Sequence, residues 1–179
     1  DDLAAKVRLM KNFGFAGKYD YVKYIGTNGK MSEVSAAMGL TSLESMDEFI
    51  VVNSRNFKQY RKELAGIPGL RLLNYNEKEK CNYQYVVVEI DEEITKVNRD
   101  QLVAVLHAEN VLARRYFYPG CHRMEPYRSY FPHYGLLLPE TEKLVKRVLS
   151  LPTGTAVKPA DIHAICHIIK LVIDNAADF

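Results

Sequence analysis

The sequence contains no tryptophan and little cysteine. Its three cysteines are odd in number and lie far apart, at Cys81, Cys121 and Cys166. A small domain held together by disulfides needs an even set of cysteines, so this pattern argues against a disulfide framework. Free thiols are typical of a reducing compartment, and we therefore expect the protein to be cytoplasmic.

The chain also lacks a strong charge of either sign and any long apolar run. The net charge is +2 over 179 residues, which is too balanced to indicate a nucleic-acid or membrane surface by itself. No apolar run approaches the length of a membrane span, and no basic and then apolar leader opens the sequence. Hydrophobic residues make up 47% and charged residues 26%, so we expect an ordinary globular protein with no membrane partner.

Apolar periodicity predicts a helical first part and a mixed second part. Over residues 32–64 apolar residues recur seven apart, which indicates a long helix that is bent or broken. The segment Gly66-Ile67-Pro68-Gly69 ends this helix. Further helices are expected over 1–12, 99–109, 141–150 and 159–175, and strands over 70–73, 83–90 and 111–117. The elements after residue 66 indicate a small α/β domain.

The stretch GTNGKMSEVSAAMGL, residues 26–40, is the most informative part of the sequence. Its two glycines bracket Asn28 and permit a positive φ or a close approach of the backbone. Ser32 stands where a helix would begin, and the amide of Asn28 and the ammonium of Lys30 lie just before it. An amide, an ammonium and a helix start together suit a phosphate group. A capped helix after a tight loop, with no ligand, fits the same residues.

The stretch ARRYFYPGCHRMEPY, residues 113–127, is the second candidate site. Arginines, aromatic rings and a histidine converge around a turn, a lining typical of sites for anionic ligands that carry a ring. Exposed arginines and buried rings at the exit of a strand would give the same composition. His163 and His167 are four apart on a predicted helix, but isoleucines surround them and no glutamate lies between, so we expect no metal site.

These two stretches, together with the Leu-Pro pattern of residues 138–152, resemble the DegT/DnrJ/EryC1/StrS family of sugar aminotransferases, which use pyridoxal 5'-phosphate (PLP). The resemblance runs along the whole chain. It implies the aspartate-aminotransferase fold, PLP fold type I, in which a large PLP-binding domain precedes a smaller α/β domain. The chain is similar to the C-terminal part only. Residues 1–66 would be a helical segment that links from the large domain, with the cofactor-phosphate loop at 26–31, and residues 67–179 the small α/β domain.

The resemblance also implies roles for five side chains. Asn28 and Lys30 match the positions that reach the PLP phosphate of the neighbouring subunit. Arg115, Tyr118 and His122 lie in the turn near the nucleotide-sugar substrate. The implied partner is a second copy of the chain, bound through the long helix and the 26–31 loop.

The family's Schiff-base lysine, the aspartate at the pyridine nitrogen and the stacking aromatic ring all lie before the point that matches residue 1. The resemblance therefore assigns no catalytic residue to this chain, and we expect the chain to bind no PLP and to be inactive by itself. The intact enzyme would transfer an amino group from glutamate to a nucleotide-linked keto-deoxysugar.

Two other functions remain open on the sequence alone. The first is a non-catalytic dimerisation or interaction module derived from the same family, which keeps the surface of residues 33–64. The second is a nucleic-acid-binding protein that uses the basic residues of 55–62 and 114–123, which the balanced charge and the lack of a motif disfavour.

Overall fold

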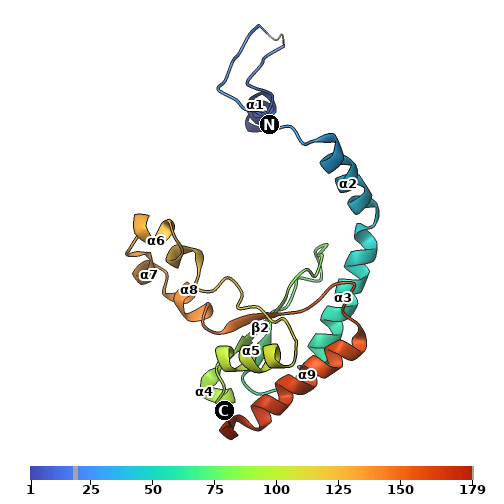
Figure 1. Cartoon of the computed structure of the whole chain (residues 1–179), viewed down its shortest axis with the longest axis vertical. Helices are drawn as coiled ribbons and strands as arrows, with labels where there is room; N and C mark the ends of the chain where they lie inside the picture. Colours follow the sequence, from blue (N-terminus) through green and yellow to red (C-terminus); the bar gives the residue numbers. More distant parts are fainter. Residues whose placement is uncertain (18–19, 179) are drawn as a thin grey trace. The chain divides into compact units, whose positions relative to one another are not determined.

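The computed structural model describes residues 1–17 and 20–178. The chain forms two compact units, Asp1–Met46 and Asp47–Phe179 (Figure 1). None of the helices in the described part of the chain is long and apolar enough to cross a membrane.

The first unit contains two helices and a loop that folds back on itself. Helix α1 spans Asp2–Met10 and α2 spans Glu33–Glu44, and neither buries a residue. Between them, isolated bridges pair Asn12 with Asn28 and Phe15 with Val22. The predicted helix over 1–12 is therefore confirmed apart from its ends.

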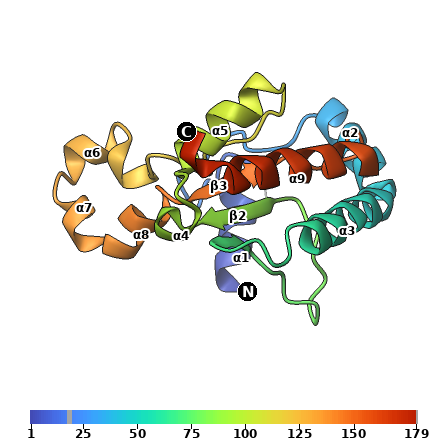
Figure 2. The same cartoon turned by 90° about the horizontal axis from the view of Figure 1, so that it is seen from below.

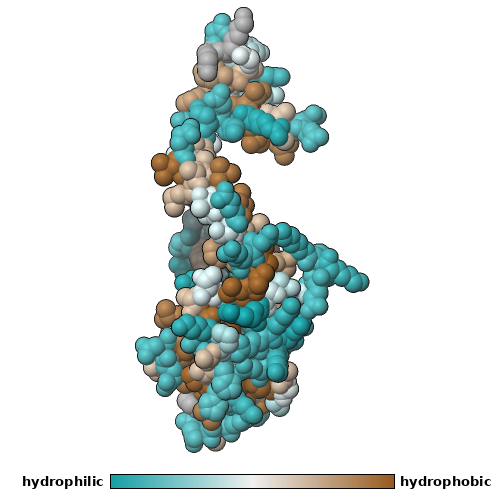
Figure 3. All heavy atoms as spheres, turned by 90° about the vertical axis from the view of Figure 1, so that its right-hand side faces the viewer, coloured by the Kyte–Doolittle hydropathy of each residue, from teal (hydrophilic) through white to brown (hydrophobic). Residues whose placement is uncertain are grey.

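The predicted long helix is broken, as expected. Helix α2 ends at Glu44, Ser45 is its C-cap, and α3 spans Met46–Glu63. The large hydrophobic side chains of α2 are exposed: Val34, Met38, Leu40 and Leu43. Figure 3, which views the molecule from the side of α2 and α3, shows hydrophobic side chains that reach the surface along this helical segment. Helix α3 differs, because it buries Asn56, Phe57 and Tyr60.

The second unit is built on a three-stranded antiparallel sheet in the order β1-β2-β3. The strands are β1 Leu70–Leu72, β2 Val86–Ile90 and β3 Val148–Leu151. Leu70 pairs with Ile90, and Val86 with Leu151. Helices α5 (Arg99–Ala108) and α9 (Pro159–Asp174) pack against each other, and α9 runs across the sheet (Figure 2). Both helices were predicted from their periodicity.

One hydrophobic core joins the sheet to three helices. This core contains Phe57 and Tyr60 of α3 and Leu64, which follows the helix. Side chains from the other large elements of the unit pack around them. The Tyr60 hydroxyl donates a hydrogen bond of 2.9 Å to the carbonyl oxygen of Pro152. The two compact units divide between residues 46 and 47, and a small domain over residues 67–179 stays a prediction.

One predicted strand is wrong, and one predicted helix is confirmed only in its first part. Residues 111–117 form no strand, because only Arg114 makes a bridge, to Ser150, and Phe117 has a φ of 49°. The helix predicted over 141–150 is α8, Pro139–Leu144, and it gives way to β3. Val148, Leu149 and Leu151 of β3 are buried against β2, and this distant pairing overrides the local helical pattern.

Several short helices were not predicted. They are α4 (Glu92–Thr95), η1 (Cys121–Arg123), α6 (Tyr127–Tyr130), α7 (Tyr134–Leu137) and η2 (Ala176–Asp178).

Candidate functional site

The loop of residues 26–30 is held against the end of α1 by backbone hydrogen bonds. The Thr27 amide donates to the carbonyl oxygen of Met10 at 2.9 Å, and the Gly29 amide donates to that of Lys11 at 2.8 Å. The Phe13 amide donates in turn to the carbonyl oxygen of Thr27 at 3.1 Å. The loop therefore has a defined backbone, although its side chains are exposed.

Gly26 is required by a close approach of two chain segments. A Cβ atom at this position would lie 2.4 Å from the carbonyl oxygen of Met10 and 2.4 Å from the amide nitrogen of Gly14. Any side chain would push the loop away from α1. Of the two reasons that the sequence leaves open for a glycine here, the structure shows close approach of the backbone.

Lys30 and Asn28 are exposed on this loop. The Lys30 ammonium donates a hydrogen bond of 3.0 Å to the side-chain oxygen of Asn12 and lies 4.9 Å from the centre of the Phe13 ring. Two residues later Ser32 caps α2, since its hydroxyl accepts a hydrogen bond of 3.1 Å from the Ser35 amide. The predicted cap is confirmed. An accessible amide and ammonium before a helix start are the donors that a phosphate monoester needs, so the loop fits such a group.

The second candidate site, in the other unit, is organised around the ring of Tyr118. Its centre lies 5.0 Å from the guanidinium carbon of Arg99 and 4.7 Å from that of Arg115. Arg115 also lies 3.7 Å from a carboxylate oxygen of Asp100. Half of the Arg115 side chain is exposed, so a cationic head held beside an aromatic ring is available to an anion.

His122 points away from solvent, into a small ionic cluster. Its ring Nε2 lies 2.6 Å from Oε1 of Glu142, and the same oxygen accepts a hydrogen bond from Arg123. The histidine side chain is 5% exposed. The hydrogen bond from Arg123 first, and that from His122 second, lower the pKa of Glu142 to about 2. Gly120, at a φ of 96°, leaves room for the ring, because a Cβ there would lie 2.7 Å from ring atom Cε1.

The structure thus brings Arg115 and Tyr118 into contact, and it gives His122 a partner within the fold. Whether these three residues and Asn28 and Lys30 act on a ligand remains a prediction. Sequence reasoning missed Arg99 and Glu142, which organise the second candidate site. Arg99 had a signal: it lies three, four and seven residues before Leu102, Val103 and Leu106, on the buried face of α5.

No group of three or more His, Cys, Asp or Glu side chains in the described part of the chain is arranged to hold a metal ion. His163, considered above with His167, lies with its Nδ1 3.0 Å from a carboxylate oxygen of Glu63. Burial raises the pKa of the Cys166 thiol to about 12, so this cysteine stays protonated and unreactive.

Comparison with known proteins identifies close matches along most of the chain. The sequence model of the DegT/DnrJ/EryC1/StrS aminotransferase family matches residues 1–170. A dTDP-4-amino-4,6-dideoxy-D-glucose transaminase of Escherichia coli is 35% identical over 156 residues, which cover 86% of this chain and 42% of the relative. A GDP-perosamine synthase of Vibrio cholerae is 27% identical over 171 residues, 95% of this chain and 45% of the relative.

A solved structure also matches almost the whole chain. The crystal structure of DesI in the presence of its TDP-sugar product superposes with a TM-score of 0.86 at 47% identity, over 99% of this chain and 44% of DesI. The chain therefore spans less than half the length of each of these relatives.

Proposed function

The chain belongs to the DegT/DnrJ/EryC1/StrS aminotransferase family, and we propose that it is the C-terminal portion of a PLP-dependent enzyme that aminates a nucleotide-linked keto-deoxysugar. The observation that carries the proposal is the match to DesI, at 47% identity and over 99% of this chain. The name of the Escherichia coli relative, a transaminase of a dTDP-linked dideoxy sugar, supports the same substrate class. We take glutamate as the amino donor.

Asn28 and Lys30 would hold the cofactor phosphate in this enzyme. Both side chains are exposed, on a loop whose backbone is fixed against α1. The amide donates directional hydrogen bonds, and the ammonium supplies a full charge to a dianion. PLP, when bound, carries the amino group from donor to acceptor.

The nucleotide sugar would bind at the turn that carries Arg115, Tyr118 and His122. The guanidinium of Arg115 is held beside the Tyr118 ring, so one patch offers both a cation and an aromatic ring. His122 acts differently: Glu142 already engages its ring Nε2, so the histidine fixes the shape of the turn more than it offers a free donor.

The direct test uses the complete reading frame that contains these residues. The purified protein, loaded with PLP, is incubated with a dTDP-linked 4-keto-6-deoxyhexose and glutamate labelled with nitrogen-15. We expect the label in the amino group of the product sugar, detected by mass spectrometry. Label that stays in glutamate with every nucleotide sugar offered, in a protein that binds PLP, would contradict the proposal.

A second candidate function, a dimerisation module, is favoured by one observation. Helix α2 buries none of its residues, although Val34, Met38, Leu40 and Leu43 are large and apolar. Leu40 and Leu43 lie on one side of α2, and we propose that a second copy of the chain covers this side. Light scattering should find a dimer for the chain and a monomer for Leu43→Lys. Leu112→Lys is the matched control, since Leu112 is also exposed but lies outside α2. Dimers that survive Leu43→Lys, or that Leu112→Lys dissolves equally, would place the contact elsewhere.

A further inference from the structure

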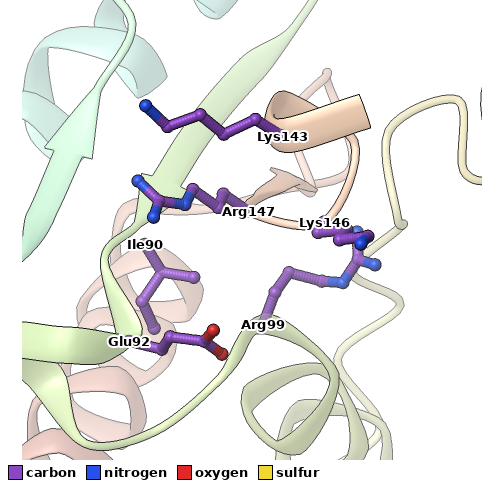
Figure 4. A pocket seen from close by; sticks show the side chains of 6 residues that line it. All are labelled: Ile90, Glu92, Arg99, Lys143, Lys146 and Arg147. Carbon is purple, nitrogen blue, oxygen red and sulfur yellow. The ribbon is translucent and has the colours of Figure 1, made fainter. Parts of the chain in front are cut away.

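A pocket in the second unit is lined mainly by cationic side chains. Its volume is about 230 Å³, and it lies between the end of β2, the starts of α4 and α5, and the turn from α8 to β3. We call it the basic pocket. Figure 4 shows its six lining side chains: Ile90, Glu92, Arg99, Lys143, Lys146 and Arg147.

The charges of this pocket are unbalanced. Its lining has four cationic side chains and one carboxylate, that of Glu92. Arg99 is already paired with Asp100 at 2.7 Å, which leaves a local excess of two positive charges. The whole chain carries a net charge of only +2. Among the residues that the structure describes, Lys143, Lys146 and Arg147 form no ion pair. Figure 4 shows the side chains of Lys143 and Arg147 extending in the same direction across the pocket.

A buried arginine holds the basic pocket in shape. Arg99 is 1% exposed, and its Nη1 donates hydrogen bonds to the carbonyl oxygens of Val145 at 3.0 Å and Val148 at 2.9 Å. The amide of Ile90 donates to the carbonyl oxygen of Arg147 at 2.9 Å. Both ends of the turn that carries Lys146 and Arg147 are therefore fixed. In Figure 4, Lys146 lies on the same side of the pocket as Arg99, and the side chains of Lys143 and Arg147 extend to the other side.

We propose that the basic pocket binds the phosphate groups of a small phosphorylated molecule. Unpaired cations that line one pocket repel one another, and a multivalent anion relieves that repulsion while it gains charge-assisted hydrogen bonds. Arg147 offers a planar fork of donors, and the two lysines offer mobile point charges. The Glu92 carboxylate favours a ligand that carries a hydroxyl or amine donor beside its phosphate.

The size of the basic pocket sets the ligand class. A volume of about 230 Å³ admits one or two phosphoryl groups and a small body. A nucleic acid would instead need a stripe of charge along the surface. The inference does not depend on the proposed function, because it concerns only the residues around this pocket.

The test measures binding of inorganic pyrophosphate and inorganic phosphate to the 179-residue chain by calorimetry, at constant ionic strength. We expect saturable binding at one site, tighter for pyrophosphate. The triple variant Lys143→Gln, Lys146→Gln, Arg147→Gln should weaken pyrophosphate binding by roughly tenfold or more. The control variant removes three exposed lysines elsewhere, Lys62→Gln, Lys78→Gln and Lys170→Gln, and should change the affinity by less than about twofold.

A second variant guards against a loss of folding in the first. Glu92→Gln removes the one repelling carboxylate and should strengthen pyrophosphate binding several-fold. Equal weakening by the triple and control variants would overturn the proposal, because it indicates general attraction to basic surface. An absence of saturable binding, no gain with Glu92→Gln, or tighter binding of a single-stranded oligonucleotide than of pyrophosphate would overturn it as well.

Discussion

At the scale of single residues, Glu142 is the acceptor that fixes the turn after Tyr118. Its Oε1 takes hydrogen bonds from Arg123 and from the ring of His122, and these contacts lower its pKa to about 2. A carboxyl group whose pKa falls on folding stabilises the folded state at every pH at which the folded state holds it ionised. The contribution is complete above the ordinary pKa of 4.5 and is lost as the pH falls towards about 2.

Glu142→Gln should therefore lower the urea midpoint of unfolding at pH 6. The difference from the unchanged chain should shrink between about pH 4.5 and about pH 2, because the carboxyl group is then protonated in both states. Urea titrations across this range measure it. Glu140→Gln is the control, since Glu140 is exposed and lies on the same helix. A difference that stays constant with pH would show that packing, not charge, is lost.

Asn28 and Lys30 permit a second prediction, in the intact enzyme. Asn28→Ala should cost about 1.5–3 kcal/mol of PLP binding, the range for hydrogen bonds to charged groups. Lys30→Ala should weaken PLP binding more at low salt than at high salt, because an exposed charge is screened. Lys30→Arg should retain binding. PLP titrations followed by absorbance give the dissociation constants.

Lys6→Ala serves as the control for that prediction, since Lys6 is an exposed lysine on α1. If Lys6→Ala and Lys30→Ala weaken PLP binding equally, the loop has no specific role. The proposal that one active site takes residues from two chains can be tested by mixing Asn28→Ala with a variant that lacks the Schiff-base lysine. Restored activity in the mixed dimers is expected when the two groups that form one site come from different chains.

At the scale of elements, local patterns identified the longer helices and the strands β1 and β2, but not β3. Helices α5 and α9 combine apolar periodicity with capping residues close in sequence, so the sequence alone predicts them. Strand β3 depends on Val86 and Val88 of β2, some sixty residues away along the chain, and its own Val148 and Leu151 also fit a helical face. The same limit applies to the candidate site. The motif indicated Asn28 and Lys30, but Glu142 meets His122 only through the tertiary fold.

The capping box of α5 supplies a prediction at this scale. The Asn98 side chain accepts a hydrogen bond of 2.9 Å from the Gln101 amide, and the Gln101 side chain accepts one of 2.9 Å from the Asn98 amide. Asn98→Ala should destabilise the second unit by about 0.5–2 kcal/mol in urea titrations. Ser32→Ala removes the equivalent cap from α2, which buries nothing, and should leave that transition unchanged. Equal shifts from both substitutions would mean that the two units unfold together.

At the scale of the whole molecule, the hydrophobic core belongs to one unit. All members of the core cluster in the described residues, from Phe57 to Val172, lie in the unit that begins at Asp47. Helix α3 contributes Phe57 and Tyr60, both nearly inaccessible to solvent. A small domain that began at residue 67 would lack these two side chains.

We therefore expect a chain of residues 47–179 to fold by itself, and a chain of residues 67–179 not to. Loss of two buried aromatic side chains costs about 3–5 kcal/mol each, a large part of the stability of a domain of this size. Near-ultraviolet circular dichroism and the cooperativity of thermal unfolding compare the two. A cooperative transition in the shorter chain would contradict this expectation and would support residue 67 as the start of the domain.

The break at Ser45 also bears on how such proteins change over generations. A crossover between two related genes at this codon joins the end of one helix to the start of another, and it leaves every core contact of the second unit within one parent. Recombination within α3 would combine core side chains from two different parents. A natural recombinant or a designed chimera joined at Ser45 therefore keeps the core of the second unit unchanged, whichever parent supplies the residues before it.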